Sequence, residues 1–386
     1  MNASVQKALK DSRSFLCLEC GRCTAVCPVS GVKQDFSPRR VLSNLLTLNN
    51  SDPLNSTSVW ECLTCGYCSL VCPTRVDYTG LMRAVRMEAE KPALEELCSH
   101  GGVMQTIMQI MVSGNLDQKR MGWIPEEAKY SKTKGEVIYF TGCLPYFDAF
   151  FSYIDVDTLQ TGRQTLRLLN ALGVKPVVLP NERCCGHDLL WSGDLDGFRR
   201  LNEINLELFA GTGARILVTS CAECYHIFKY EVPELVGDHG LEVLHISQFL
   251  YRHKSSLQSK LRPGEKLRLT YQDPCRLGRQ GGVYDEPRDV LTLLPGVELA
   301  EMPRHGPQAL CCGTSAWMNC TSYSKQIQAE RLAEAAGTGA GVLVTACPKC
   351  YIHFTCAQHD QPSSSEKQVT VRDMTDVIAS SLEERR

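Results

Sequence analysis

The sequence predicts an α+β chain, in which a helical N-terminal part precedes two copies of an α/β unit built on a parallel sheet. Residues 1–90 contain stretches such as PRRVLSNLLTL, where apolar residues recur at intervals of three and four, as in amphipathic helices. Residues 136–386 instead alternate β-branched runs with helical patterns. Alternation on this scale is typical of a parallel sheet covered by helices on both faces.

The second part of the chain is an internal duplication. The first copy begins with the strand-like EVIYFTGC and the second with LRLTYQDPC. Each continues with a helix, a short apolar strand (VKPVVLP or VELAEMP), a Cys-Cys-Gly motif and a long helix that ends near a glycine. A strand then leads into Cys-x-x-Cys, and a last strand and helix complete the copy. The Cys-Cys pairs lie 127 residues apart and the Cys-x-x-Cys pairs 126, which indicates a true repeat.

These patterns predict four segments. Residues 1–90 form a helical, cysteine-rich domain, and residues 91–135 form a helical connector with the polar linker PEEAKYSKTKGE. Residues 136–260 are the first α/β copy and residues 261–386 are the second.

The composition is that of a globular protein, with cysteine as the anomaly. Of 386 residues, 43% are hydrophobic, and the net charge of −2 gives no reason to expect nucleic acid as a partner. The first 20 residues carry no signal-peptide pattern, and no stretch reaches the roughly 18 apolar residues of a membrane span. We therefore expect a cytoplasmic protein whose 21 cysteines stay reduced and free to bind metal.

Two runs of four cysteines share the pattern C-x2-C-x2-C-x3-C followed by proline. The first run consists of Cys17, Cys20, Cys23 and Cys27. The second consists of Cys62, Cys65, Cys68 and Cys72. Zinc sites usually take their ligands as two separated pairs, which fits these runs poorly.

Such runs are typical of two-cluster iron–sulfur proteins, where the fourth cysteine of each run ligates the other cluster. The expected ligands of one cubane [4Fe–4S] cluster are Cys17, Cys20, Cys23 and Cys72. Those of the second cubane are Cys62, Cys65, Cys68 and Cys27. The proline after each run lacks an N–H and favours an extended turn that aims the fourth thiolate away from its own run.

Each α/β copy offers five further thiols, all placed where a strand ends. In the first copy they are Cys143, Cys184, Cys185, Cys221 and Cys224. In the second they are Cys275, Cys311, Cys312, Cys347 and Cys350. We expect the five to converge at the carboxyl edge of a parallel sheet, the usual ligand position in such folds. A redox-active Cys-x-x-Cys pair is the main alternative, and it leaves three cysteines of each copy unexplained; a vicinal disulfide is a minor one.

The two copies resemble the cysteine-rich CCG domain of heterodisulfide reductases. The resemblance lies in the order Cys, Cys-Cys-Gly, Cys-x-x-Cys, with 40 residues between the first two motifs in one copy and 35 in the other. With the two ferredoxin-type runs in front, nearly the whole chain resembles the D subunit of heterodisulfide reductase. That family includes iron–sulfur subunits of glycolate, lactate and anaerobic glycerol-3-phosphate oxidation systems, and of the class II benzoyl-CoA reductase complex.

The resemblance implies that each set of five cysteines holds a further [4Fe–4S] cluster of non-cubane type. It favours an electron relay in a multi-subunit anaerobic oxidoreductase, for example of the class II benzoyl-CoA reductase type, because members with that role outnumber disulfide reductases. The alternative is the catalytic subunit of a heterodisulfide reductase, which cleaves a disulfide of the CoM-S-S-CoB type at the paired clusters.

The partners follow from what the sequence lacks. It contains no glycine-rich dinucleotide fingerprint and no phosphate loop. We therefore expect a flavoprotein or other redox subunit as partner. The sequence is also compatible with peripheral association with a membrane.

A few residues outside the cysteine sets are further candidates. His187 follows Cys185-Gly186 and is a candidate proton donor, although tuning of a cluster by hydrogen bonding is the favoured role. His226 and His353 are expected to be structural. The three remaining cysteines, Cys98, Cys320 and Cys356, are expected to be small buried hydrophobes.

Overall fold

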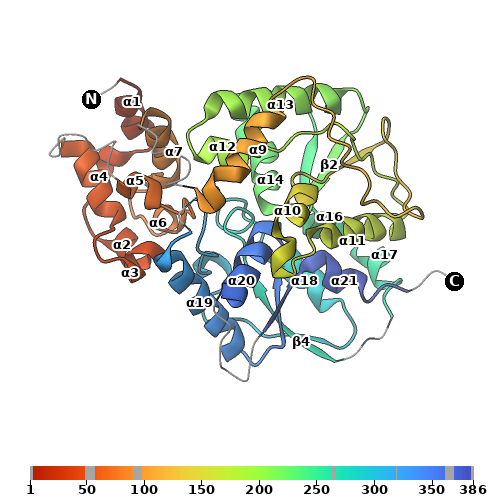
Figure 1. Ribbon diagram of the computed structural model, residues 1–386. Coiled ribbons are helices and arrows are strands. Elements are labelled where there is room, and N and C mark those ends of the chain that lie inside the picture. The colour runs from red at the N-terminus through yellow and green to blue at the C-terminus, as the bar shows by residue number, and fades with distance from the viewer. Residues whose placement is uncertain are drawn as a thin grey trace. The chain divides into compact units, whose positions relative to one another are not determined.

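The computed structural model describes residues 3–47, 57–89, 98–262, 264, 266–318, 320–360 and 369–383 (Figure 1). The chain divides into two compact units. Unit 1 comprises Met1–Val112, Gly186–Phe198 and Leu310–Arg331. Unit 2 comprises Ser113–Cys185, Arg199–Ala309 and Leu332–Arg386.

Unit 1 is helical in its N-terminal part, as the sequence predicts. Its helices are α1 (Ala3–Asp11), η1 (Ser14–Leu16), α2 (Arg22–Val26), α3 (Pro28–Val32), α4 (Pro38–Thr47), α5 (Thr57–Glu61), α6 (Tyr67–Leu70), α7 (Tyr78–Glu88), η2 (Ser99–Gly102), α9 (Val103–Met111) and α12 (His187–Trp191). Of the predicted helical connector, residues 91–97 lie outside the described residues, and α9 is its helix. The side chain of Asp77 caps α7 by accepting a hydrogen bond from the Gly80 amide.

A buried arginine links the elements of unit 1. The Arg86 side chain is fully buried on α7 and donates hydrogen bonds to the carbonyl oxygens of Val59, Trp60, Cys62 and Trp191. Its guanidinium therefore joins α7 to α5, to the start of the second cysteine run and to the end of α12. A planar group with five N–H donors suits this role, since each carbonyl oxygen receives its own donor.

Unit 2 contains two parallel sheets, which confirms the predicted α+β class with two α/β copies. The first sheet has the order β1-β2-β3, formed by Val137–Phe140, Ile216–Thr219 and Glu242–His245. The second has the order β5-β4-β6-β7, formed by Val297–Leu299, Leu267–Gln272, Val342–Thr345 and Thr370–Asp373. The strand that precedes each Cys-x-x-Cys pair, β2 or β6, is an inner strand of its sheet.

One expected strand differs between the copies. VELAEMP contains β5, whereas VKPVVLP in the first copy contains no named strand, only single-residue bridges from Val177 to Ser131 and Ile138. Val177 still lies beside β1, because its amide donates to the carbonyl of Val137 and its carbonyl accepts from Tyr139. Pro176 and Pro180 flank it and lack the N–H groups that a longer ladder needs.

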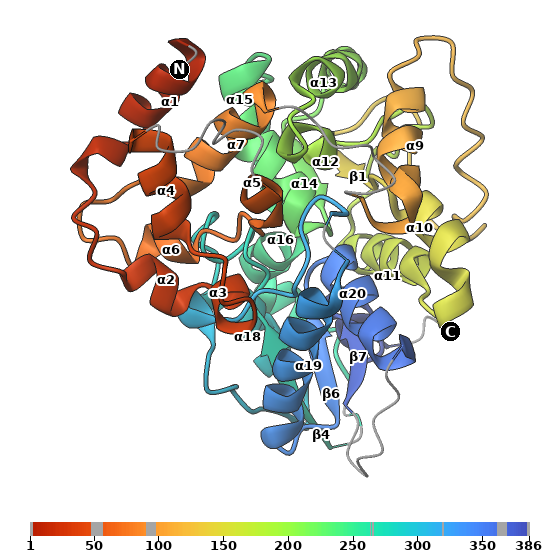
Figure 2. The ribbon, with the colours of Figure 1, turned by 60° about the vertical axis from the view of Figure 1, so that its left-hand side comes forward.

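The helices of the two copies pack reciprocally. Those that lead to and follow the sheets are α10 (Leu144–Phe151), α11 (Thr158–Ala171), α13 (Leu195–Ala210), α14 (Ala222–His226), α15 (Val232–Leu235), α16 (Ile246–Arg252), α17 (Lys254–Gln258), α18 (Asp285–Thr292), α19 (Ser322–Gly337), α20 (Pro348–Asp360) and α21 (Met374–Ala379). In the first copy α11 packs on α21, the last helix of the second, while α18 of the second copy packs on α16, the helix that follows the last strand of the first. Figure 2 shows α20 beside β6 and β7, which it contacts. Because α11 corresponds to α18 and α16 corresponds to α21, these two contacts are equivalent, as a two-fold relation between the copies requires.

The turn after α12 generates a test of this packing. Gly193 has a φ of +80°, and a Cβ built there would lie 2.2 Å from the Arg86 carbonyl oxygen. Gly213 has a similar φ of +74° but open space around it. We predict that Gly213→Ala lowers the free energy of unfolding by about 1–2 kcal/mol, the cost of left-handed backbone for alanine. Gly193→Ala lowers it by more, because backbone must also move. Anaerobic urea unfolding of both variants measures the difference, and equal losses would contradict the close approach.

Candidate metal centres

The two cysteine runs share one backbone geometry. The residue before the second cysteine of each run, Glu19 or Thr64, has a positive φ, of 52° and 47° respectively. Its amide points to the sulfur of the first cysteine, with N···Sγ distances of 3.4 Å to Cys17 and 3.3 Å to Cys62. Left-handed backbone costs a side-chain-bearing residue free energy, and such strain concentrates at functional sites. In each run, the backbone therefore turns so that the amide before the second cysteine faces the sulfur of the first cysteine.

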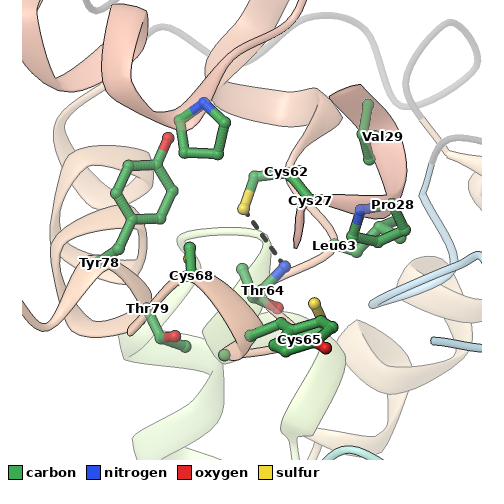
Figure 3. Close-up of a pocket in the computed structure, with 13 residues that line it drawn as sticks. Cys27, Pro28, Val29, Cys62, Leu63, Thr64, Cys65, Cys68, Tyr78 and Thr79 are labelled. Carbon is green, nitrogen blue, oxygen red and sulfur yellow. Dashed lines mark hydrogen bonds between the residues drawn. The ribbon is translucent and has the colours of Figure 1, made fainter. Parts of the chain in front are cut away.

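Four thiols of mixed origin line one pocket of unit 1. Its cysteines are Cys62, Cys65 and Cys68 of the second run and Cys27, the last residue of the first (Figure 3). Cys27 ends α2 in extended backbone, and Pro28 begins α3 at its first position. This is the set that the crossed pattern predicts for one cubane.

The electrostatics of this pocket suit a metal cluster. Burial raises the pKa of Cys27 to about 12, and it also raises the pKa of Cys68 well above its usual value, with Cys62 and Cys65 adding repulsion. Four thiolates cannot therefore share the pocket unless cations neutralise them. Iron ions provide that charge and prefer thiolate ligands, so the donor set fits a [4Fe–4S] cluster.

The other predicted cubane set lies nearer to solvent. Cys20 is exposed, and Cys17, Cys23 and Cys72 are half-buried; in the other set Cys27 and Cys68 are half-buried as well, but Cys62 and Cys65 are buried. Partial burial raises the pKa of Cys23, and the nearby Cys17 thiol adds to that rise. The helices α2 and α6, which carry Cys23 and Cys68, contact each other, so the two runs lie side by side.

In the first α/β copy, the five cysteines lie within unit 2 at the carboxyl edge of its sheet. Cys143 follows β1 and Cys221 follows β2. The Sγ atoms of Cys224 and Cys185 are 3.4 Å apart, and Cys184 neighbours Cys185. Gly142 has a φ of +61°, and a Cβ there would lie 3.2 Å from the Cys224 sulfur, so this position leaves room for the thiol.

The thiols of the two copies meet. Hydrogen bonds from Cys224 and from Cys347 of the second copy lower the pKa of Cys221 to about 5. The same contact with Cys221 raises the pKa of Cys347 to about 12. The two Cys-x-x-Cys pairs therefore face each other, and their sulfurs form a continuous cluster in unit 2.

The second copy divides its cysteines between the units. Cys275, Cys347 and Cys350 belong to unit 2, and Cys311 and Cys312 belong to unit 1. Gly313 after the pair has a φ of +87°, and a Cβ there would lie 2.8 Å from the Ser324 carbonyl oxygen. The glycine of this Cys-Cys-Gly motif thus permits a tight turn against α19. This role is additional to the expected close approach of its backbone to a ligand.

Buried carboxylate–arginine pairs hold the loops that carry Cys143 and Cys275. Glu182 accepts hydrogen bonds from the amides of Thr141 and Gly142 and lies 3.0 Å from the Arg120 guanidinium. In the second copy, Asp273 binds Arg288 through two hydrogen bonds of 2.7 and 2.9 Å. The sequence predicts neither pair, since the partners come from distant segments.

A second feature that the sequence did not predict lies inside the Cys-x-x-Cys pairs. Glu223 of the first pair and Lys349 of the second occupy equivalent positions, and Lys349 Nζ lies 2.7 Å from the Glu223 carboxylate. Their side chains are only 13% and 4% exposed. The ion pair thus joins the two copies beside the Cys221–Cys347 contact. The signal in the sequence that could have revealed this pair is the opposite charge of the residues at equivalent positions of the two copies.

The remaining candidates have varied outcomes. His187 is buried in unit 1 with Nδ1 2.8 Å from the Asp188 carboxylate, and its role beside a cluster stays a prediction. His226 is buried against Glu231, at 3.2 Å. Cys98 is buried as expected, but Cys320 is exposed, so the prediction of a buried hydrophobe is wrong there. Cys320 lies outside the named helices and strands, two residues before α19 begins.

Comparison with known families matches these sites to two domain types. The 4Fe-4S dicluster domain matches residues 13–76, and the cysteine-rich CCG domain matches residues 137–229 and 269–355. The D subunit of dihydromethanophenazine:CoB–CoM heterodisulfide reductase from Methanosarcina barkeri is 29% identical over 95% of this chain and 93% of its own length. The chain therefore combines a 4Fe-4S dicluster domain with two CCG domains and is similar over nearly its whole length to heterodisulfide reductase D. It is an iron–sulfur oxidoreductase component with several [4Fe–4S] clusters.

Other relatives of this D-like chain carry different names. The EtfAB:quinone oxidoreductase of Syntrophomonas wolfei is 29% identical over 67% of this chain and 36% of its own, and one component of the CoM/CoB fumarate reductase of Methanothermobacter marburgensis is 28% identical over 63% and 46%. A hypothetical protein from Helicobacter pylori shares the fold, with a TM-score of 0.57 and 10% identity over 99% of this chain and 77% of its own. The matched ranges lie inside the predicted domain segments, whose bounds stay a prediction. Among the described residues, no helix has the length and apolarity to cross a membrane.

The pocket that combines Cys27 with Cys62, Cys65 and Cys68 predicts which double variants lose only one cluster. Cys27→Ala and Cys62→Ala should each lower iron content by about four atoms per chain, and the double variant by the same four, because both thiols serve one cluster. Cys17→Ala with Cys62→Ala should lose about eight. Iron and acid-labile sulfide assays of anaerobic protein measure this. A loss of eight in the Cys27/Cys62 double variant would show that the runs are not crossed.

The Glu223–Lys349 pair predicts that substitutions of its two members change the unfolding free energy in a strongly non-additive way. Lys349→Met removes the buried cation that faces the Glu223 carboxylate and should cost about 3–5 kcal/mol of unfolding free energy. Adding Glu223→Gln removes the negative charge that Lys349 neutralised and should restore most of that loss. Anaerobic urea unfolding checks the cycle. Additive losses would mean that the two side chains do not act as a pair.

Proposed function

We propose that this chain is the electron-transfer subunit of a cytoplasmic, multi-subunit anaerobic oxidoreductase, in which electrons pass between two cubane clusters and two clusters of the CCG type. The observation that carries the proposal is the convergence of Cys27 with the second cysteine run in one pocket. When bound, the clusters would supply one-electron transfer. The chain's own thiols would hold them, and two thiols of the inner set, Cys62 and Cys65, are buried.

The proposed ligands are those predicted from the spacing. The outer cubane set is Cys17, Cys20, Cys23 and Cys72, and the inner set is Cys62, Cys65, Cys68 and Cys27. The two CCG sets are Cys143, Cys184, Cys185, Cys221 and Cys224, and Cys275, Cys311, Cys312, Cys347 and Cys350. The cysteines of the first copy and the Cys221–Cys347 contact support these sets within unit 2. For His187 we propose tuning of the neighbouring cluster.

We propose a flavin-coupled complex, of the class II benzoyl-CoA reductase type or a related one. Several relatives are named as subunits of redox complexes, and this chain shows no dinucleotide or phosphate motif in its sequence. A flavoprotein or another redox subunit would then exchange electrons with the cubane sets. Any association with a membrane would be peripheral, which agrees with the lack of a spanning helix in the part of the chain that the structure describes.

A second candidate function is reductive cleavage of a disulfide, as in the relatives named heterodisulfide reductase. The specific observation in its favour is that both CCG copies keep all five cysteines and that their Cys-x-x-Cys pairs touch. Cleavage of one disulfide takes two electrons and two protons and yields two thiols. Two facing one-electron centres match that requirement.

Metal content and spectra test the proposed function. Anaerobically purified protein should be brown, with iron and sulfide each at about sixteen per chain, four for each [4Fe–4S] centre. Cys184→Ala should remove about four of each and spare the paramagnetic signals of both cubanes, since its set is separate. Cys98→Ala, a buried cysteine outside every set, is the control and should keep all four centres. Colourless, zinc-loaded protein would refute the proposal.

The same material separates the two functions. A thiol-dependent paramagnetic signal on oxidation, together with disulfide turnover by a reduced viologen dye, supports the reductase. Reversible reduction of all centres without disulfide turnover supports the relay.

A further inference from the structure

Exposed apolar side chains gather around the outer cysteine set. Seven large hydrophobic side chains are exposed among the described residues, and four of them adjoin the two cysteine runs: Phe15, Leu16, Leu18 and Leu70. Phe15 is 62% exposed and Leu18 is 68% exposed. Single exposed apolar residues are ordinary, but several together mark a surface that binds something.

These four side chains belong to segments that the backbone ties together. The Asp77 amide donates to the Ser12 carbonyl at 2.9 Å, which joins the chain before the first run to the chain after the second. Leu70 ends α6, and α6 contacts α2 of the first run. Cys20, the exposed thiol of the outer set, lies between Leu18 and α2.

The charges of this region are positive. Exposed Arg13, Arg22 and Arg75 have no acidic partner among the residues that the structure describes. The nearby acids are engaged: Glu19 lies 3.8 Å from Arg39, Asp11 pairs with Lys7 at 2.5 Å, and the Asp77 carboxylate caps α7. An acidic surface would therefore find unpaired cations here.

We propose that this surface, the outer-set face, docks a redox protein whose cofactor edge is apolar and ringed by carboxylates. The outer-set face consists of Arg13, Phe15, Leu16, Leu18, Cys20, Arg22, Leu70 and Arg75. The inference rests on the proposed function, because only an electron carrier needs a partner at its most exposed metal site. Complementary charge speeds encounter, and apolar contact then holds the two cofactors close.

Two other occupants fit less well. A second copy of this chain would bring like arginines together, which opposes association. An anionic lipid surface would match the arginines and the apolar residues, but it would cover Cys20 with a layer that accepts no electron. Electron-transfer rates, vesicle binding and oligomeric state distinguish all three.

The probe is an acidic flavodoxin in its anionic hydroquinone form, which gives up one electron to become the neutral semiquinone. Stopped-flow mixing with the oxidised full chain measures the second-order rate of cluster bleaching. At low ionic strength, Arg13→Glu with Arg22→Glu and Arg75→Glu should slow this rate at least about tenfold, and salt should shrink the effect. Leu18→Ser should slow it with little change in salt dependence.

A matched control keeps net charge equal. Arg167→Glu with Arg200→Glu and Arg215→Glu changes three exposed arginines of unit 2 by the same total charge and should leave the rate within about twofold. Photoreduced deazaflavin, which needs no docking, should reduce all variants equally. Equal flavodoxin rates in both triple variants would overturn the docking surface.

Two further outcomes would assign the outer-set face to a different occupant. Wild-type protein that sediments with phosphatidylglycerol vesicles, and loses this through the outer-set substitutions while flavodoxin rates stay equal, would assign the face to a membrane. A dimer that Leu18→Glu converts to monomer would assign it to a second copy. Failure of the proposed function is distinct, since protein without iron and sulfide would not be reduced by deazaflavin at all.

Discussion

The structure depends on thiol groups that are buried together without being joined in pairs. Burial raises the pKa values of Cys27 and Cys68, so these side chains are neutral until cations enter. A cluster of thiolates in a pocket of low polarity is stable only with metal. Metal loading and folding of these regions are therefore coupled, and iron with sulfide becomes part of the core.

The duplication shapes the second group of sites. Because α11 packs on α21 and α18 packs on α16, the carboxyl edges of the two sheets are brought to one place. The contact between Cys221 and Cys347 and the ion pair beside it follow from that arrangement. A repeat thus supplies two similar sets of cysteines, and its internal symmetry makes their Cys-x-x-Cys pairs neighbours within unit 2.

The two cubane sets are similar in sequence and different in surroundings. The outer set includes an exposed thiol, whereas the inner set lies beside a buried arginine that donates to the Cys62 carbonyl. Burial disfavours added negative charge, and a nearby cation favours it. Equal spacing therefore produces sites that differ in solvent access and in electrostatics.

The sequence by itself determined the class, the repeat and the candidate ligands, because spacing of cysteines and alternation of strands and helices are local properties. It also predicted that Cys27 joins the second run. It did not predict Glu182, Asp273 or the Glu223–Lys349 pair, whose meaning depends on partners from distant segments. Nor did it predict which thiols are exposed, or that Cys221 would touch Cys347. Those features arise only when helices pack and sheets align, since burial and long-range contact are properties of the folded chain.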